Sequence, residues 1–428
     1  MQVEECEYVI VGSGAGGATL AKELTSRHKR VIVVEMGSRV QGADAYGRFL
    51  RKTYPNRVIN LIKEWKAHPV IYKAITAGGS TVISHGNGVR CLEEELSAYG
   101  ISLDSEFNEA EKEMRIAPIA EELLSEGSIN ILQASRELGY RMERMPKFID
   151  PLKCKRCGEC TNGCMHGAKW TALDYLQKAI NDGAKVLYNT RVDGVIIDGG
   201  VARGIRGTGL KGQVKIIADT VIITAGGLST PVILQRSGIE AGRGLFVDLT
   251  VDTYGVTNGF NQLGEVPTTL IDTEFYRSKG FILLSFVSQH RMTRFVKFGV
   301  KGLSMPEHKL IGIITKIRDE PSGYVQVDGA VCKPVTAKDR ARLREGSLIA
   351  GEILVGAGAD RGTLVVSKPQ GGHPGGTAAI GVVVNSDLQT QVRNLFVCDA
   401  SVLPTAPGLP PILTIIALAK RLSKTLSG

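Results

Sequence analysis

The stretch Tyr8-Val-Ile-Val-Gly12-Ser-Gly14-Ala-Gly16-Gly17 decides the fold of this chain. Its first four residues predict a short buried strand, its glycines predict a tight turn, and residues 18–24 have the composition of a helix. The next apolar run, Val31-Ile-Val-Val-Glu35, predicts a second strand. Strand, glycine turn, helix and strand in this order are the dinucleotide-binding fingerprint of a Rossmann-like sheet.

The glycine turn and the end of the second strand suit two parts of a dinucleotide. We expect Gly12, Gly14 and Gly17 to let the backbone approach a pyrophosphate at the N-terminus of the helix. Glu35 stands eighteen residues after Gly17, where its carboxylate can accept hydrogen bonds from ribose hydroxyls. The glycine motif alone does not separate NAD from FAD.

Four cysteines lie close together in Cys154-Lys-Arg-Cys157-Gly-Glu-Cys160-Thr-Asn-Gly-Cys164. The CxxCxxCxxxC spacing is typical of a loop that holds a [4Fe–4S] cluster, and we expect all four residues to be ligands. Structural zinc usually takes two CxxC pairs that lie further apart, and nothing suggests an oxidising compartment that would favour disulfides. Met165 follows Cys164 where ferredoxin-type loops have proline, which leaves zinc, or a three-iron cluster without Cys164, as alternatives.

Basic residues crowd the cysteine loop. Lys147, Lys153, Lys155, Arg156 and Lys169 predict a docking patch for an acidic electron carrier such as a ferredoxin. The same charges would stabilise a reduced, more negative cluster. The alternative is a solvated rim without a partner.

Length and composition set wider bounds. The chain has 428 residues and a formal net charge of +9, which allows two domains and favours acidic partners. We expect no nucleic-acid partner, because no basic motif is interleaved with aromatic residues. We also expect a cytoplasmic protein, since no apolar run could span a bilayer and the acidic start leads straight into a strand; the oligomeric state stays open. The isolated cysteines are expected to be small buried apolar residues: Cys6, Cys91, Cys332 and Cys398.

Further segments follow one another along the chain in a recognisable order. They are Ala77-Gly78-Gly79-Ser80-Thr81, then residues 221–239 with the elements Ala-Gly226-Gly-Leu-Ser229-Thr-Pro231 and Ser237-Gly238-Ile239, and finally the C-terminal segments around His373, Asp399 and Pro411. Together they resemble the glucose–methanol–choline (GMC) oxidoreductase family, which uses FAD. The cysteine run is also similar to a segment of long-chain alcohol oxidases in that family.

The resemblance implies FAD as the cofactor and a small molecule as the substrate. It implies that His373 lies in front of flavin N5, where it acts as general base or positions the substrate hydroxyl. The residues that it implies beside FAD, from the adenosine end to the flavin ring, are Val192, Glu35, Gly12, Gly14, Gly17, Asp399, Ala400, Gly79, Ser80, Pro411 and Ile412.

Two positions depart from the family's pattern. Where the family has a second histidine or asparagine beside the catalytic histidine, this chain has Pro410, which offers neither a side-chain donor nor a backbone N–H. Ser84 stands where asparagine is usual, with His85 and Asn87 as candidates to compensate. The chain is also short for the family, which predicts a smaller pocket and disfavours sugar substrates.

The predicted fold is α/β, with a Rossmann-like FAD-binding domain formed by residues 1–90, 169–239 and 370–428. Residues 91–168 are predicted to be a helical segment with the cluster-binding loop. Residues 240–369 are predicted to be an α+β substrate domain with an antiparallel sheet, followed by a helix from Ala337 to Glu345.

Three functions are compatible with these predictions. The first is an oxidoreductase that moves a hydride between a CH–OH group and flavin N5 and exchanges single electrons with a carrier through a [4Fe–4S] cluster. The second keeps both cofactors but reduces or introduces a C=C bond in a lipid or isoprenoid. The third is a non-catalytic electron-transfer subunit of a larger complex.

Overall fold

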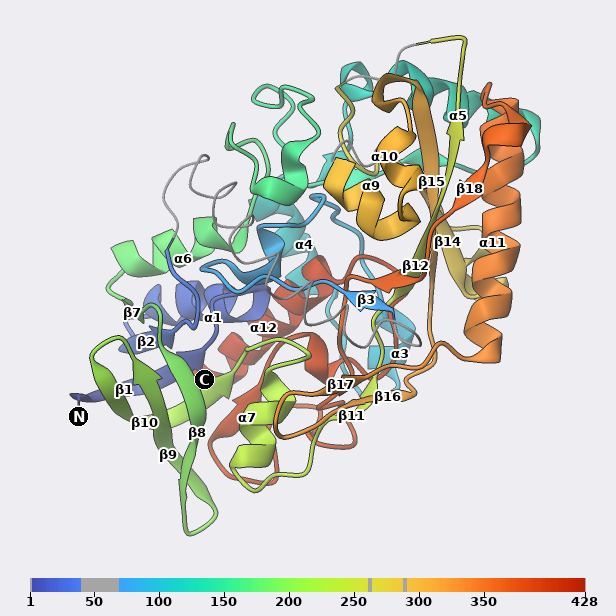
Figure 1. Ribbon diagram of the computed structural model, residues 1–428. Helices are drawn as coiled ribbons and strands as arrows, with labels where there is room; N and C mark the ends of the chain where they lie inside the picture. Colours follow the sequence, from blue (N-terminus) through green and yellow to red (C-terminus); the bar gives the residue numbers. More distant parts are fainter. Residues whose placement is uncertain (1, 40–68, 261–263, 288–290, 428) are drawn as a thin grey trace.

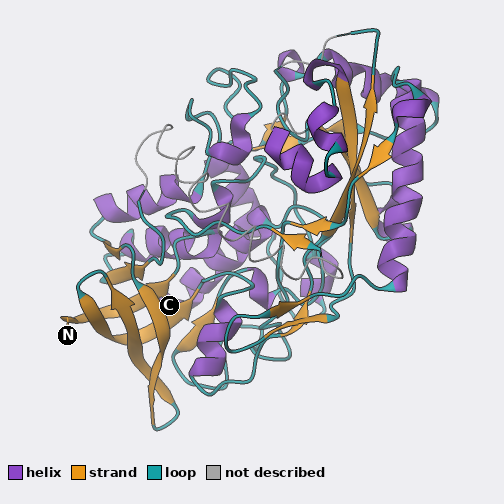
Figure 2. Cartoon of the chain, in the orientation of Figure 1, coloured by secondary structure: helices purple, strands orange, loops and turns teal. Residues whose placement is uncertain are grey.

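The computed structural model describes residues 2–39, 69–260, 264–287 and 291–427. Figure 1 shows two groups of strands at opposite ends of the molecule, and Figure 2 shows helices packed between them and along the outer side of the second group. The α/β fold class, with a dinucleotide-binding sheet and a second sheet, is thereby confirmed.

The first sheet is mainly parallel and contains both strands of the glycine fingerprint. Its seven strands within the described residues are, in sheet order, β7 (Lys185–Leu187), β2 (Val31–Val34), β1 (Gln2–Val11), β10 (Gly212–Ile223), β9 (Val201–Gly209) and β8 (Arg191–Asp198), with β20 (Leu395–Val397) beside β10. β1 runs parallel to both β2 and β10, whereas β9 and β8 are antiparallel additions at one edge. The carboxyl ends of β1, β2, β10 and β20 therefore meet at one edge, where α/β sheets bind ligands.

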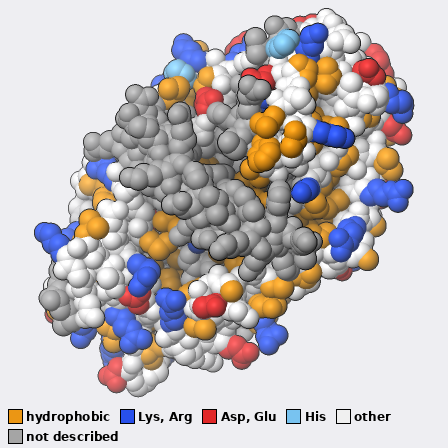
Figure 3. Space-filling model, in the orientation of Figure 1, with side chains coloured by type: hydrophobic (Ala, Val, Ile, Leu, Met, Phe, Trp, Pro, Cys, Tyr) orange, Lys and Arg blue, Asp and Glu red, His pale blue; other side chains and the backbone are white. Residues whose placement is uncertain are grey.

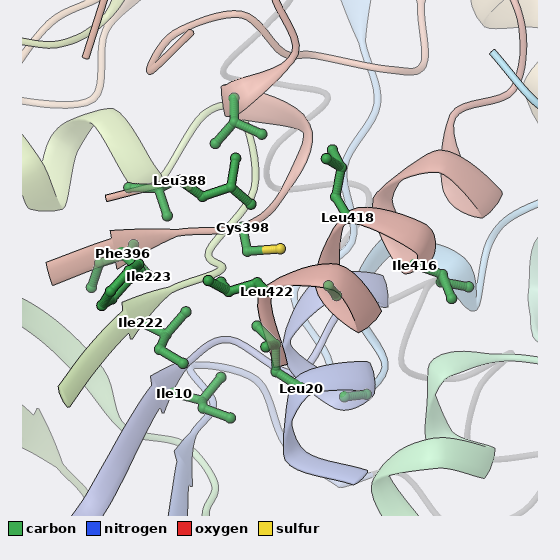
Figure 4. Packing of buried hydrophobic residues seen from close by; sticks show 14 of the residues in the cluster. Ile10, Leu20, Ile222, Ile223, Leu388, Phe396, Cys398, Ile416, Leu418 and Leu422 are labelled. Carbon is green, nitrogen blue, oxygen red and sulfur yellow. The ribbon is translucent and has the colours of Figure 1, made fainter. Parts of the chain in front are cut away.

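Three helices pack on this sheet: α1 (Ala15–Thr25), α6 (Ala172–Asn181) and α12 (Ile412–Ser427). α1 starts directly after the glycine turn, and α12 ends next to the C-terminus of the described residues. Figure 4 shows side chains of β1, β10, α1 and α12 in contact, with the Cys398 thiol among them. Burial of these apolar surfaces is the main force that holds helices and sheet together.

The second sheet is mostly antiparallel. Its eight strands in the described part of the chain are β3 (Val70–Ile71), β19 (Gln370–Gly371), β12 (Leu249–Val256), β15 (Leu310–Ile317), β14 (Phe281–Ser285), β13 (Leu270–Asp272) and β5 (Glu143–Arg144), with β18 (Val365–Val366) also beside β12. The long helix α11 (Ala337–Gly356) covers one face. The other face turns its buried side chains toward the first domain.

Side chains of the central strands β12 and β15 point alternately to the two faces of the sheet, and the two faces carry different kinds of residue. On the α11 side, Val251 and Ile313 pack with Leu343 and Ile353 of the helix. On the opposite side, Asp252 pairs with Ile314 in the strand register, and Thr250 with Lys316. Because side chains alternate between faces with a period of two, the charged residues of β12 and β15 gather on the face toward the first domain.

Shorter elements complete the described structure. They are α3 (Glu93–Ser97), α4 (Asp104–Met114), α5 (Glu126–Glu137), α7 (Thr230–Arg236), α8 (Phe275–Ser278), α9 (Arg291–Phe298) and α10 (Lys301–Ser304), the sheet β11 (Arg243–Leu245), β16 (Gly323–Val325) and β17 (Val331–Cys332), and the pair β4 (Ala117–Pro118) and β6 (Pro146–Lys147). α3, α4 and α5 form the predicted helical segment. The 3₁₀ turns are η1 (Gly79–Thr81), η2 (Glu121–Leu123), η3 (Glu159–Asn162), η4 (Glu307–Lys309), η5 (Arg361–Thr363) and η6 (Ala400–Val402).

The chain passes between the two sheets more than once. β3, from the first 90 residues, and β5, from the segment 91–168, both join the second sheet. The exact domain boundaries therefore stay predictions. In the part of the chain described, each helix lacks either the length or the apolar character that a membrane span needs.

The burial of one isolated cysteine, Cys332, differs from the prediction. Cys6, Cys91 and Cys398 are buried, as predicted, but Cys332 is half-buried, because β17 lies at the edge of its small sheet. On the face shown in Figure 3, apolar side chains gather over α9 and α10, where Phe295, Val300 and Leu303 are exposed.

Candidate active site

The glycine turn after β1 is packed tightly on one side and open on the other. A Cβ on Gly12 would lie 2.4 Å from the Thr224 carbonyl oxygen, and a Cβ on Gly17 would lie 2.0 Å from the Gly12 oxygen. Gly12 also has a φ of 104°, in the left-handed region that favours glycine. A Cβ on Gly14, by contrast, would meet open space. The turn thus leaves room at the N-terminus of α1, which is where the predicted pyrophosphate would lie.

Glu35 lies at the end of β2 and is held by the glycine turn. Its Oε2 accepts hydrogen bonds from the Ser13 N–H (3.0 Å) and Oγ (2.7 Å), and its Oε1 accepts one from the Gly37 N–H (2.7 Å). Ser13 Oγ also accepts a hydrogen bond from the Gly78 N–H (3.1 Å). Burial raises the pKa of Glu35, and the hydrogen bonds from Ser13 and Gly37 act in the opposite direction. The Ser13 hydroxyl group therefore links the glycine turn to Glu35 and to the segment at Gly78.

Val192 and Gly79 also lie near this turn. The N–H of Thr190, two residues before Val192, donates a hydrogen bond to the Glu35 carbonyl oxygen (2.9 Å). A Cβ on Gly79 would lie 3.0 Å from the Gly14 Cα, so the two glycines face each other. The exposed Ser80 accepts a hydrogen bond at Oγ from the Ala74 N–H (3.2 Å). The structure thus brings together the sequence-predicted residues of the adenosine end and of the GGS element.

Asp399 connects the C-terminal segment to the turn after β10. Its Oδ2 accepts hydrogen bonds from the Gly226 N–H (2.8 Å) and Thr230 Oγ1 (2.6 Å), and its Oδ1 accepts one from the Ser401 N–H (2.7 Å). The Ala400 carbonyl oxygen accepts a hydrogen bond from the Gly376 N–H (3.1 Å). Asp399 and Ala400 therefore lie at the same sheet edge as the glycine turn, and the carboxylate of Asp399 is used to join segments.

His373 belongs to a buried polar group that the sequence did not reveal. Its Nδ1 lies 3.0 Å from Asp248 Oδ2, and the same oxygen lies 2.5 Å from Lys316 Nζ. Asp248 is 0% exposed, while the His373 side chain keeps 30% of its surface exposed. Because a carboxylate only accepts, Nδ1–H is the donor, which leaves Nε2 free as a base.

The same aspartate reaches the predicted flavin turn. Its Oδ1 accepts a hydrogen bond from the Gly408 N–H (2.9 Å), and Gly408 precedes Pro410, Pro411 and Ile412 at the start of α12. Asp248 thus fixes His373 relative to the Pro411–Ile412 turn. No local motif marks Asp248 or Lys316, since Asp248 directly precedes β12 and Lys316 lies on β15, 68 residues further along the chain.

Burial and the Lys316 charge lower the pKa of His373, against the opposing effect of Asp248. For Asp248, burial alone would raise the pKa, but Lys316 and His373 hold it below its ordinary value. His373 is therefore neutral at neutral pH and able to accept a proton.

His85 and Asn87 were the candidates to compensate for Ser84, which stands where asparagine is usual. Asn87 Oδ1 accepts hydrogen bonds from Lys147 Nζ (2.7 Å) and Thr268 Oγ1 (3.0 Å), so it serves the local structure. His85 stacks on Phe286 with 5.0 Å between ring centroids. Burial, and then the charges of Lys147, Lys297, Lys169 and His373, lower its pKa well below the usual value. His85 is therefore a neutral imidazole, and the charge of His373 is among those that lower its pKa.

The four cysteines of the CxxCxxCxxxC loop line one small cavity, together with His166, Lys169 and Val266. All four are free thiols. The backbone takes left-handed φ values at Arg156, Gly158, Gly163, Cys164 and Gly167, which winds the loop around the cavity. Within the described ranges, however, no three His, Cys, Asp or Glu side chains stand in a metal-binding arrangement. The thiol set and the shared cavity suit a metal–sulfur group, whereas a ligand geometry is not shown.

Two of the predicted docking residues lie elsewhere than expected. Lys147 and Lys169 are 1% and 4% exposed, so the prediction that they belong to a surface patch is wrong. Lys169 Nζ donates to the carbonyl oxygens of Val82, Ser84 and Cys160, each at 2.7 Å. These carbonyl groups draw the ammonium inward, which the basic composition of the loop did not reveal. Lys153 and Lys155 are exposed and Arg156 is half-exposed.

The thiols and the buried lysines influence one another. Burial raises the pKa of Cys160 to about 11, while Lys169 and Lys147 act to lower it. Burial lowers the pKa of Lys147 to about 7 and that of Lys169 to about 8. Because the thiolate form is the metal ligand, neighbouring positive charge favours ligation.

Comparison with known proteins places these features in a family. Residues 6–250 and 334–419 match the N-terminal and C-terminal parts of the GMC oxidoreductase family. An uncharacterized protein of Methanocaldococcus jannaschii is 32% identical over 97% of this chain and 98% of its own length. The long-chain-alcohol oxidase FAO3 of Arabidopsis thaliana is 24% identical over 97% of this chain and 67% of its own length.

Solved structures share the fold at low sequence identity. The pyridoxine 4-oxidase from Mesorbium loti has a TM-score of 0.74 and 16% identity, with 98% of this chain and 99% of that chain covered. A formate oxidase of Aspergillus oryzae has a TM-score of 0.75 and 15% identity, with 100% and 98% covered. The two family matches span more than half of the sequence. The chain therefore belongs to the GMC oxidoreductase family.

Proposed function

We propose that this oxidoreductase oxidises a CH–OH group of a small molecule with FAD and passes the electrons singly to an acidic carrier protein. The observation that carries the first half is the buried His373–Asp248–Lys316 group beside the Gly408–Ile412 turn. The observation that carries the second half is the cavity lined by Cys154, Cys157, Cys160 and Cys164.

The described residues fit FAD. The open space before Gly14 lies at a helix N-terminus, and Glu35 and Asp399 are fixed at the same sheet edge. The flavin ring of bound FAD supplies hydride chemistry. Pro411 and Ile412, at the start of α12, would lie at the ring, with Gly79 and Ser80 beneath it.

His373 handles the proton of the substrate hydroxyl. Its Nδ1–H stays bonded to Asp248, so Nε2 accepts the proton as the hydroxyl carbon loses its hydride. The imidazolium that forms is stabilised by the buried carboxylate. Lys316 balances the charge of Asp248 before the proton arrives. His85 is the side chain best placed to take over the role that the family gives to the residue replaced by Pro410.

A [4Fe–4S] cluster held by the four cysteines would supply one-electron transfer. The loop lies against the segment that follows Gly79–Thr81, because Lys169 bonds to Val82, Ser84 and Cys160. The exposed part of the loop carries Lys153 and Lys155 and also the apolar Leu152 and Met165. A small apolar centre among positive charges suits an acidic carrier such as a ferredoxin.

The first test is the cofactor content of protein purified without oxygen. We expect FAD and about four iron and four sulfide per chain, with an EPR signal on reduction and carrier reduction after substrate is added. Zinc, or no metal, in FAD-containing protein would contradict the cluster and leave the flavin chemistry standing. If the iron stays oxidised after substrate has reduced the flavin, the proposed electron transfer from flavin to cluster is contradicted.

A second candidate function is reduction or introduction of a C=C bond in an apolar substrate. It is favoured by Pro410, which removes one proton-handling group, and by the exposed apolar side chains on α9 and α10. Alcohols of graded chain length and matched enones, screened by flavin bleaching, separate the two. Bleaching by alcohols alone supports the first proposal, and reoxidation by enones alone supports the second.

Two neighbouring glycines should respond differently to alanine. Gly17→Ala forces a Cβ to within 2.0 Å of the Gly12 oxygen and should destabilise the protein by roughly 1–3 kcal/mol. Gly14→Ala should leave the unfolding temperature of FAD-free protein unchanged but lower the FAD content, because its Cβ enters the open space. Thermal melts and FAD absorbance measure both effects, and wild-type FAD content in Gly14→Ala would contradict this placement.

Asp248→Asn should impair both catalysis and stability. The amide cannot accept from His373, Gly408 and Lys316 together, and the Lys316 charge loses its partner, which costs about 3–5 kcal/mol. Loss of the carboxylate also removes the negative charge that raises the pKa of His373, so the acid limb of the rate profile should move to lower pH. Stopped-flow flavin reduction against pH measures this shift; an unchanged acid limb would show that His373 is not the titrating base.

A further inference from the structure

Two buried lysines lie between the cysteine cavity and the flavin side of the site. Lys169 bonds through Nζ to two carbonyl groups of residues 82–84 and to the Cys160 carbonyl, and its backbone N–H lies 3.4 Å from Cys164 Sγ. Lys147 donates to the His85 oxygen (3.0 Å) and to Asn87 Oδ1 (2.7 Å). Lys169 therefore connects the loop that follows the GGS element with the cysteine loop, whereas Lys147 connects it with Pro267 and Thr268, next to Val266 of the cavity lining.

Neither ammonium has a carboxylate partner among the described residues. Lys147 completes its hydrogen bonds with the Pro267 carbonyl (2.6 Å) and Thr268 Oγ1 (3.1 Å), which are neutral like all the acceptors of Lys169. A buried charge without an opposite charge is costly, so such lysines are rare unless something negative is near. Lys169 lines the same cavity as Cys160 and Cys164, and its Nζ lies 2.7 Å from the Cys160 carbonyl oxygen.

This pattern differs from that of the other buried lysines. Lys316 pairs with Asp248, Lys297 with Asp252, Lys333 with Asp319, and Lys420 with Glu23 and Glu113. The protein thus neutralises these buried ammonium groups with carboxylates. At the cysteine cavity no carboxylate of the described residues bonds to either lysine, although the buried Glu265 acts on Lys147 from further away. Thiolates, which exist when the cavity holds a metal group, would supply the nearest negative charge.

We propose that Lys147 and Lys169 are the counter-charges of the metal–thiolate group in the cysteine cavity, and that they raise its reduction potential. This inference rests on the proposed [4Fe–4S] cluster. Reduction adds one negative charge at the cavity, and two nearby ammonium groups stabilise that charge; net charge and hydrogen bonds to sulfur are known determinants of cluster potential. Both lysines are positioning residues, since they act on the group that the cysteines hold.

The test compares reduction potentials of purified, iron-containing variants. Lys169→Met and Lys147→Met remove one buried charge each with little change of volume. At a fixed applied potential, each should lower the ratio of reduced to oxidised cluster about tenfold, equal to a negative shift of about 59 mV for one electron. EPR-monitored titration gives the value, and the flavin absorbance reports that the fold is intact.

Lys153→Met is the matched control, because it removes the same charge from an exposed position on the same loop. The reduction potential of Lys153→Met should differ from that of wild type by only a small fraction of the shift expected for the two buried variants. Equal potentials for wild type and both buried variants would overturn the inference. If a methionine variant loses iron but keeps FAD, the charge-retaining Lys→Arg variant decides: regained iron supports the charge role, and continued loss overturns it.

The measurements distinguish a failure of the proposed lysine role from a failure of the proposed cluster. Unaltered protein without iron and sulfide contradicts the proposed cluster, and the lysine role falls with it. Unaltered protein with a normal cluster, and variants with unshifted potentials, contradict the lysine role alone.

Discussion

His373→Ala should lower the rate at which substrate reduces the flavin by about 10²–10⁴-fold, the usual contribution of a general base. FAD content should not change, because the hydrogen bond of the His373 side chain runs to Asp248. Stopped-flow absorbance in a single turnover measures the chemical step without a carrier. His308→Ala, an exposed histidine on η4, is the control and should react like wild type.

The direction in which the rate of flavin reduction changes with pH shows that the titrating group acts as a base. Neutral His373 is the active form, and its pKa lies below the ordinary value because of burial and Lys316. The rate in the unaltered enzyme should therefore stay level through neutral pH and fall as the pH drops through that lowered pKa. A wild-type rate of flavin reduction by substrate in His373→Ala would contradict the role of His373 as general base. Unaltered protein whose flavin no substrate reduces would instead support the non-catalytic electron-transfer subunit.

Cys160→Ser should abolish carrier reduction while substrate still reduces the flavin at a rate within a few-fold of wild type. Cys160 is the buried cysteine of the loop and lines the cavity, so loss of its thiol should remove the metal group. Iron analysis, and separate assays of flavin bleaching and ferredoxin reduction, show whether the two halves of the reaction come apart.

Cys332→Ser is the matched control for this prediction. Cys332 is a half-buried free thiol on β17, outside the cysteine loop, and its replacement should alter neither iron content nor carrier reduction. Full iron content and normal carrier reduction in Cys160→Ser would refute the assignment of Cys160 as a ligand. Normal carrier reduction without iron would show that electrons leave by another route.

Local patterns predicted the elements that depend on local chemistry. The glycine turn, its flanking strands and α1 were correctly predicted, because backbone packing of the kind seen at Gly12 and Gly17 leaves few alternatives to glycine. The end of α11 was not. The helix was expected to stop at Glu345, before Gly346, yet it continues to Gly356. A Cβ at position 346 would lie 2.3 Å from the Thr315 side chain, so glycine here allows close packing on β15 instead of ending the helix.

The sequence by itself determined the family, the dinucleotide fingerprint, the position of His373 and the spacing of the four cysteines, since each is carried by residues that are neighbours in the chain. Only the tertiary structure decided which charges meet. Asp248 and Lys316 come together across β12 and β15, and Lys169 reaches the loop at Val82 across 87 residues. Such contacts depend on strand register and burial over long separations, and no local spacing encodes them.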